Sequence, residues 1–217
     1  THFAVTISGG TNLVIYINGI ATKTYTTTAI VANTGSFVIG RSGDQSTEYY
    51  SGLVDEVRIS NIARAPEEIA LDASRRPYSV YTSDVLDLTN VASWTSFKWN
   101  TFGLATGDGE TATASAQSAL VAQWNFNETS GTSAVSGGTC GTSCNGTLTN
   151  FASTTSQDQA PLTGWTATNR RWGVGALMFD GTDDYISIPT ALLSGTIYSV
   201  ESWFNINKLG TTAIIFS

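Results

Sequence analysis

The chain has 217 residues, which suits one large β-sandwich or two small domains, and 41% of them are hydrophobic, enough for a globular core. Its net charge of −7 and pI near 4.5 argue against nucleic-acid binding, because that function needs a basic face to neutralise phosphates. Apolar runs stay far below the roughly 18 residues of a membrane-spanning helix, so we expect no membrane insertion. No signal-peptide pattern opens the chain at Thr1, as expected of a mature product or an excerpt.

The first part of the chain, residues 1–73, predicts a series of β-strands followed by a helix. Residues 2–8 and 12–18 alternate apolar and polar side chains, are rich in β-branched residues, and are joined by Gly-Gly-Thr, a pattern typical of a hairpin. A proline followed by two glutamates then predicts one short helix near residues 66–73. Three more strands are expected between the hairpin and the helix, at residues 21–27, 36–40 and 52–60.

Residues 74–118 have the composition of a connector. Two short runs, 83–88 and 94–100, predict a small strand pair, and a Gly-, Thr- and Ala-rich spacer with little to bury follows them. Trp94 and Trp99 are expected to pack inside this strand pair rather than to serve as exposed sugar platforms.

Residues 119–217 again predict strands. The most informative stretch is residues 175–188, where two apolar runs flank Asp180-Gly181-Thr182-Asp183-Asp184. This composition predicts a hairpin with an acidic tip. The other strands are expected at the start of the segment, near residues 120–126, and at residues 145–151, 198–206 and 212–217.

Two of these stretches carry a resemblance to a known family. The sequence ALMFDGTDDYISIP, residues 176–189, resembles the early hairpin of bacterial LamG-like jelly rolls in the concanavalin A-like lectin and glucanase superfamily. The sequence GLVDEVRI, residues 52–59, resembles the late strand of the same domains. The resemblance implies an all-β, concanavalin A-like jelly-roll sandwich of antiparallel strands. Because the late strand comes first here, residues 1–73 resemble a C-terminal half-domain and residues 119–217 an N-terminal half-domain.

This reversed order is what results from cutting a tandem array out of register, or from circular permutation. A half-sandwich exposes an apolar face and open strand edges, so each half needs a complement. The halves could pair within one chain, or between copies of the chain joined head to tail into a filament. We take pairing between copies as the working hypothesis.

Several features suggest an extracellular or cell-surface protein. Cys140 and Cys144 lie in a polar loop, and we expect a small local disulfide between them, since exposed thiols oxidise; two reduced thiols are the alternative. A zinc site is not expected, because the chain has a single histidine, His2. Asn127 and Asn145 match the glycosylation pattern, which also arises by chance in a chain this rich in threonine.

The acidic residues suggest calcium. A turn rich in Asp offers the oxygen ligands that calcium needs, so Asp180 with Asp183 is one candidate group. The resemblance implies a second group, Asp55 with Asn127 or Glu128, because a structural calcium in these sandwiches is often held near the opening segment and the late strand. Alternatively, the turn aspartates only make local hydrogen bonds, and Asp55 pairs with a backbone amide or with Arg58.

Enzymatic activity is not expected. Glucanases of the superfamily carry paired carboxylates on one face of a strand, whereas Asp55 and Glu56 are adjacent and should point to opposite faces. Two functions remain: a structural or adhesive repeat of an extracellular protein, and a carbohydrate-binding module. The second would use aromatic residues in or beside loops, namely Trp165, Trp172, Tyr49 and Tyr50, while Trp124 and Trp203 should be core.

Overall fold

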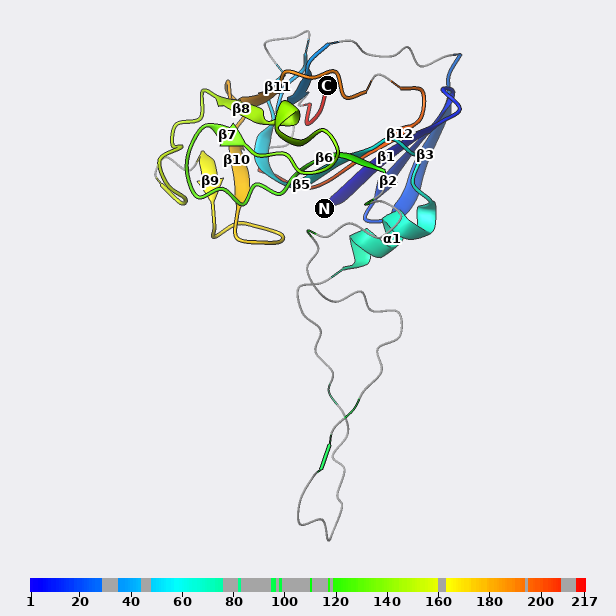
Figure 1. Cartoon of the computed structure of the whole chain (residues 1–217), viewed down its shortest axis with the longest axis horizontal. Coiled ribbons are helices and arrows are strands. Elements are labelled where there is room, and N and C mark those ends of the chain that lie inside the picture. Colours follow the sequence, from blue (N-terminus) through cyan, green and yellow to red (C-terminus); the bar gives the residue numbers. More distant parts are fainter. Residues whose placement is uncertain are drawn as a thin grey trace.

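The computed structural model describes residues 1–28, 35–43, 48–75, 119–159, 163–193, 195–207 and 214–217, together with Thr82, Thr95, Ser96, Lys98, Glu110 and Gln117. Among these residues, the strands form one eight-stranded and one four-stranded antiparallel sheet (Figure 1). The two sheets enclose the main hydrophobic core, which confirms the predicted all-β sandwich. Apart from isolated positions, the strand pair predicted within 83–100, including Trp94 and Trp99, lies outside the described residues.

Most predicted strands form, but the strand predicted at residues 212–217 does not appear among its described residues, where Phe216 makes an isolated bridge to Ile39. The eight-stranded sheet contains β1 (His2–Ser8), β2 (Asn12–Ile17), β3 (Ile20–Thr26), β5 (Ser51–Ser60), β6 (Leu120–Trp124), β9 (Gly164–Thr166), β10 (Ala176–Asp180) and β12 (Tyr198–Ile206). The four-stranded sheet contains β4 (Phe37–Ile39), β7 (Ser133–Ala134), β8 (Gly146–Thr149) and β11 (Tyr185–Ile188). The helices are α1 (Pro66–Ser74) and the 3-10 helix η1 (Gly141–Cys144).

The two half-domains interlock strand by strand within the single chain of the structure. The larger sheet has the order β3-β2-β1-β12-β5-β10-β9, so β12 of the second half lies between β1 and β5 of the first. Val200 of β12 pairs with Val5 on one side and with Ile59 on the other. The other edge of β5 pairs with β10 and, further along, with β6. Both sheets therefore draw strands from both halves.

The predicted hairpin of the first half is confirmed, because β1 pairs with β2 in antiparallel register. The hairpin predicted at residues 175–188 is wrong. Its two strands form, but β10 pairs with β5 and β9 in the larger sheet, whereas β11 pairs with β4 and β8 in the smaller one. The acidic segment between them is a crossing from one sheet to the other, where Gly181 takes a φ of 80° that favours glycine.

The core lies between the sheets and is lined by alternate residues of facing strands. Trp124, Phe126, Phe179, Ile186 and Ile188 belong to it and are at most 1% exposed. Trp124 is thus a core residue, as predicted. Trp203, predicted to be core as well, is only half-buried.

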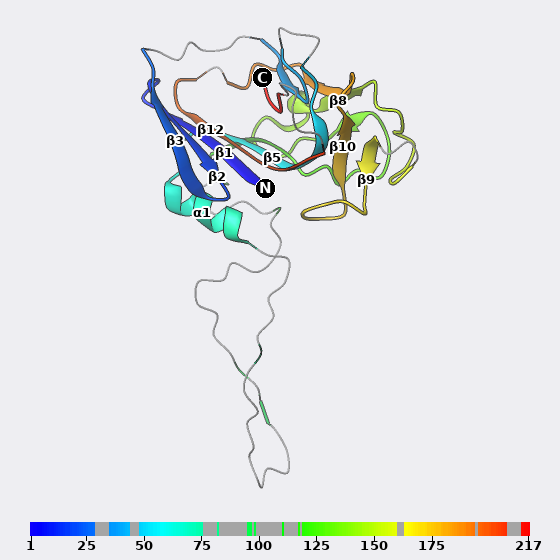
Figure 2. The same ribbon diagram turned by 180° about the vertical axis from the view of Figure 1, so that it is seen from behind.

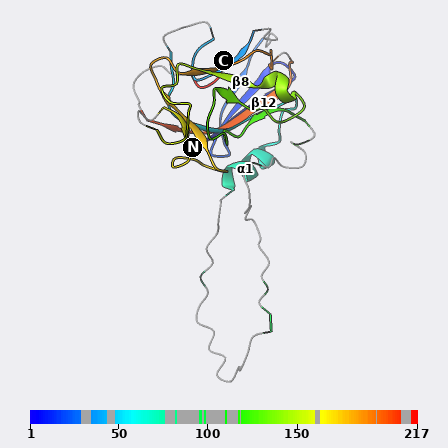
Figure 3. The same ribbon diagram turned by 60° about the vertical axis from the view of Figure 1, so that its left-hand side comes forward.

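The predicted helix is confirmed as α1, which packs on the face of β1 and β2 remote from the main core (Figures 2 and 3). Pro66 begins it, and the Glu68 carboxylate accepts a hydrogen bond from the Ala65 backbone N–H at 3.2 Å. Ile69 then packs against Ala4 and Tyr16, forming a small second core. The described part of the chain contains no helix with the length and hydropathy needed to cross a membrane.

Candidate metal centre

Three aspartates meet where the chain crosses from β10 to β11. Asp180 ends β10, while Asp183 and Asp184 precede β11, and one carboxylate oxygen from each lies within 4.8 Å of the others. The Asp180 backbone N–H donates to Asp184 Oδ2 at 2.9 Å, and the Thr182 backbone N–H donates to Asp180 Oδ1 at 2.6 Å. Oxygens that bind one calcium ion at about 2.3–2.6 Å are at most about 5 Å apart, so the spacing is compatible with calcium.

Asp184 gives this cluster its unusual character. The residue is 1% exposed, and no group of the described residues donates a hydrogen bond to its Oδ1. Burial raises the pKa of Asp184 to about 7; the hydrogen bond from Asp180 N–H opposes this shift, and the charges of Asp180 and Asp183 add to it. A buried oxygen without a donor carries a desolvation cost that a bound cation would remove. The sequence predicted Asp180 and Asp183 but missed Asp184, since an Asp in a turn is normally solvated.

Asp55, the centre of the second predicted metal group, holds a loop. Its Oδ2 accepts hydrogen bonds from the backbone N–H groups of Arg171 at 2.7 Å and Trp172 at 3.1 Å, and its Oδ1 has no hydrogen-bond donor. Burial raises the pKa of Asp55 to about 7, against the effect of these N–H donors. The Oδ2 atom of Asp55 therefore pairs with backbone amides, as the alternative to calcium binding predicted.

Asn127 holds the same loop from the opening segment. Its Oδ1 accepts hydrogen bonds from the backbone N–H groups of Val174 at 2.8 Å and Gly175 at 3.1 Å, and its Nδ2 donates to Glu110. Glu128 turns elsewhere, because its Oε1 accepts a hydrogen bond from the Val135 backbone N–H at 2.7 Å. Asp55 and Asn127 thus both bind the loop of residues 171–175. Glu128 instead binds the segment that contains Val135.

A β-bulge changes the surroundings of Glu56. The pairing of β5 with β12 shifts register between Glu201 and Trp203, and Glu56 has a φ of 53°. Asp55 and Glu56 are both at most 3% exposed, and the charge of Glu110 raises the pKa of both. Burial raises the pKa of Glu56 to about 9, although the Arg58 cation opposes this shift.

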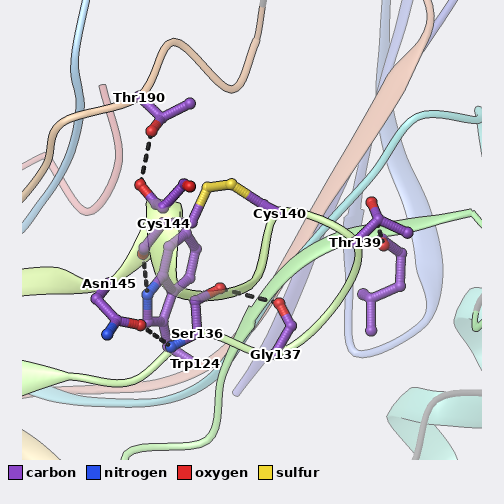
Figure 4. Close-up of a disulfide and its surroundings, with 10 residues drawn as sticks. Trp124, Ser136, Gly137, Thr139, Cys140, Cys144, Asn145 and Thr190 are labelled. Atoms are coloured by element: carbon purple, nitrogen blue, oxygen red, sulfur yellow. Dashed lines mark hydrogen bonds between the residues drawn. A yellow bond between two sulfur atoms is a disulfide. The ribbon is translucent and has the colours of Figure 1, made fainter.

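The predicted disulfide is confirmed. Cys140 and Cys144 are bonded across η1, with their Cα atoms 5.7 Å apart (Figure 4). The loop is less exposed than its polar composition predicts, because Cys144 is fully buried and its backbone carbonyl accepts a hydrogen bond from Trp124 Nε1 at 3.0 Å. The neighbouring Asn145 accepts a hydrogen bond from the Ser136 backbone N–H, and its glycosylation, like that of Asn127, stays a prediction.

Residues 1–70 match the family model described as the concanavalin A-like lectin/glucanases superfamily. This part of the chain is similar to that superfamily, and the match covers about a third of the chain. The match covers β1 to β5 and most of α1, and the strands of residues 120–217 complete the same two sheets. No curated protein matches the chain, and no solved structure does either.

In this concanavalin A-like sandwich, most of the predicted sugar-binding rings are inaccessible. Trp165, Trp172 and Tyr50 are 2%, 4% and 1% exposed, and only Tyr49 is half-buried. Trp165 packs in the core beside Phe126 and donates to the Gly131 carbonyl at 2.8 Å. These three rings therefore offer no face to a ligand, which corrects the prediction made for them.

A groove of about 440 Å³ opens beside Asp55 instead, and no pattern in the sequence predicted it. The half-buried Trp203 lines it, together with Asn169 and Asn205. The Arg171 guanidinium lies 4.2 Å from the centre of the Trp203 ring. Pairing between β5 and β12, which are remote in sequence, creates this groove.

Proposed function

We propose that the chain is a structural and adhesive module of an extracellular protein, without catalytic activity. The observation that carries this proposal is the interlocking of the two half-domains into one superfamily sandwich, with β12 held between β1 and β5. The disulfide Cys140–Cys144 supports an oxidising, extracellular compartment.

We further propose that the strand pairs between the two halves also form between copies of the chain. Residues 1–75 and 119–217 meet only through pairing and packing, and the segment 76–118 links them. If residues 119–217 of one copy completed the first half of another, every strand pair would be kept, and repetition would give a head-to-tail filament.

Light scattering across a concentration series tests whether the halves of different copies pair with one another. We expect a monomer when the protein is dilute and growing assemblies when it is concentrated. Val5→Pro should suppress these assemblies, because it removes a backbone donor from the centre of β1. A monomer at every concentration would contradict exchange and leave the closed module as the functional unit.

We also propose that Asp180, Asp183 and Asp184 bind a structural calcium ion, with Asp55, Asn127 and Glu128 as the second candidate group. The resemblance to LamG-like domains, in which calcium is frequent, supports calcium as the cofactor. The three aspartates between β10 and β11 are the preferred site, because their carboxylates already converge. In addition, no described group donates a hydrogen bond to Asp184 Oδ1. In the second group, one side-chain oxygen of Asp55 and one of Asn127 already accept hydrogen bonds from backbone amides.

Melting temperatures in calcium and in chelator test this centre. With free calcium at roughly 100 times Kd, the folded state gains about 2.7 kcal/mol, which should raise Tm by about 5–10 °C for a chain of this size. Asp184→Asn should abolish the increase, whereas Glu67→Gln, an exposed charge on α1, should keep it. An unchanged response in Asp184→Asn that disappears in Asp55→Asn would move the centre to the second group.

Carbohydrate binding is the second candidate function, and the Trp203 groove favours it. A half-buried indole beside two asparagine side chains combines a stacking surface with hydrogen-bonding groups. A glycan array tests this proposal: binding that Asn205→Ala and Trp203→Ala both weaken would support it. If the folded wild-type protein binds no plant, host or microbial glycan on the array, the structural role remains.

A further inference from the structure

A second hollow lies on the outer face of the four-stranded sheet. Residues alternate along β4 and β11, so the buried Phe37, Ile39, Ile186 and Ile188 face the core and their neighbours face outward. The hollow measures about 630 Å³, within the range of small-ligand sites. Its lining combines one cation, one aromatic ring, three hydroxyls and an apolar floor: Arg41, Tyr185, Ser36, Ser187, Ser217 and Val38.

Arg41 is held in place, and no carboxylate of the described residues neutralises it. Its guanidinium carbon lies 4.0 Å from the centre of the Tyr185 ring, a cation–π contact that favours this position of the group. Its backbone carbonyl accepts a hydrogen bond from Ser217 Oγ at 3.1 Å, which ties the residue to the wall of the hollow. Within the described ranges, no carboxylate forms an ion pair with Arg41, and its buried Nε has no acceptor.

An unpaired arginine is notable in this chain, because acidic residues exceed basic ones, 17 to 10. The described lining of the hollow contains no acidic side chain to repel an anion. A guanidinium held beside an aromatic ring suits a planar carboxylate, since two of its N–H groups can donate to the two carboxylate oxygens. The serine hydroxyls, which both donate and accept, suit a ligand that carries hydroxyl groups beside its carboxylate.

We propose that this hollow, the Arg41 pocket, binds a carboxylate-bearing sugar residue, such as a uronic acid of an acidic polysaccharide. Arg41 pairs with the carboxylate, and Ser36 and Ser187 hydrogen-bond to ring hydroxyls. The pocket shares no lining residue with the Trp203 groove or with the aspartates of the candidate calcium centre. Binding here goes beyond the structural role, and it would give an adhesive module a defined polyanionic target.

Isothermal titration of the full chain with oligogalacturonate tests the proposal, with neutral galactose oligomers and a glutamate-rich peptide as comparison ligands. We expect oligogalacturonate to bind, and we expect Arg41→Ala to weaken binding at least tenfold. Arg41→Lys keeps the charge but loses the planar guanidinium, so its affinity should lie between those of the wild type and Arg41→Ala. Lys23→Ala removes one positive charge from the exposed strand β3 and should bind like the wild type.

The outcomes separate the possibilities. Undetectable binding of oligogalacturonate by folded wild-type protein overturns the proposal, as does equal weakening by Arg41→Ala and Lys23→Ala, which would indicate a diffuse charge effect. Equal affinity for neutral oligomers removes the role of the carboxylate. Equal affinity for the acidic peptide shows a general carboxylate site and overturns the sugar assignment. If Arg41→Ala does not fold, the selective loss expected in Arg41→Lys decides the question.

Discussion

His2 is the single histidine of the chain, and the structure buries it almost completely, at 2% exposed. Its ring lies edge-on to Trp203 at 5.1 Å, and its Nε2 is 3.9 Å from Glu201 Oε2. Burial lowers the pKa of His2 to about 4, although the nearby negative charge of Asp72 opposes this shift. His2 is therefore neutral in the folded state at pH 7.

The lowered pKa of His2 predicts a loss of stability in acid. The unfolded state takes up the proton near pH 6.5, whereas the folded state resists it until about pH 4. The contribution of His2 is thus complete above pH 6.5 and is lost as the pH falls towards 4, by about 2–3 kcal/mol. Urea unfolding of the wild type and of His2→Gln at pH 7 and pH 4 should show this difference in pH dependence. Parallel pH profiles of the two proteins would contradict it.

At the scale of elements, buried charges fasten α1 to the larger sheet. Arg64, between β5 and α1, donates to Asp72 of α1 at 2.7 Å and also to Glu201 of β12. Burial works against the Arg64 cation, but these two carboxylates outweigh it and raise the pKa of Arg64. One ion-paired side chain therefore joins α1 to β12, which is far from it in sequence.

Removing Arg64 should leave the buried Glu201 carboxylate without its paired cation and should weaken the network around Asp72, which keeps Arg75 at 3.3 Å. We expect Arg64→Ala to lower the free energy of unfolding by about 3–5 kcal/mol, measured in urea. Adding Asp72→Asn and Glu201→Gln should recover much of the loss, because the uncompensated charges disappear. A loss below about 1 kcal/mol for Arg64→Ala would show that water already screens this network.

The sequence predicted individual elements better than it predicted their partners. Alternation and turn residues are local signals, so the strands at residues 2–8 and 52–60 and the helix at Pro66 were found within a residue or two. The assignment of β10 and β11 to different sheets depends on contacts with β5 and β4, which no local pattern records. Asp180 and Asp183 were found because Asp is typical of turns. The Trp203 groove and the Arg41 pocket arise only once distant strands pair.

Neither half of the sandwich is complete alone. Residues 1–75 contribute β1 to β5 and α1, and residues 119–217 contribute β12, which separates β1 from β5. The core also mixes the halves, since Phe37 stacks on Trp124, and Tyr50 packs edge-on against Phe179. The reversed order of the halves is thus compatible with one continuous sandwich, as in a circular permutant.

The most direct test is an NMR measurement of cross-strand contacts between β1 and β12 in the dilute protein. Nuclear Overhauser effects should join the backbone protons of Val5 to those of Val200, and those of Val200 to Ile59, as the strand registers require. Mixing isotope-labelled and unlabelled chains would then show whether these contacts form within a chain or between copies. A β12 that pairs with neither β1 nor β5 in either sample would contradict the interlocked sandwich.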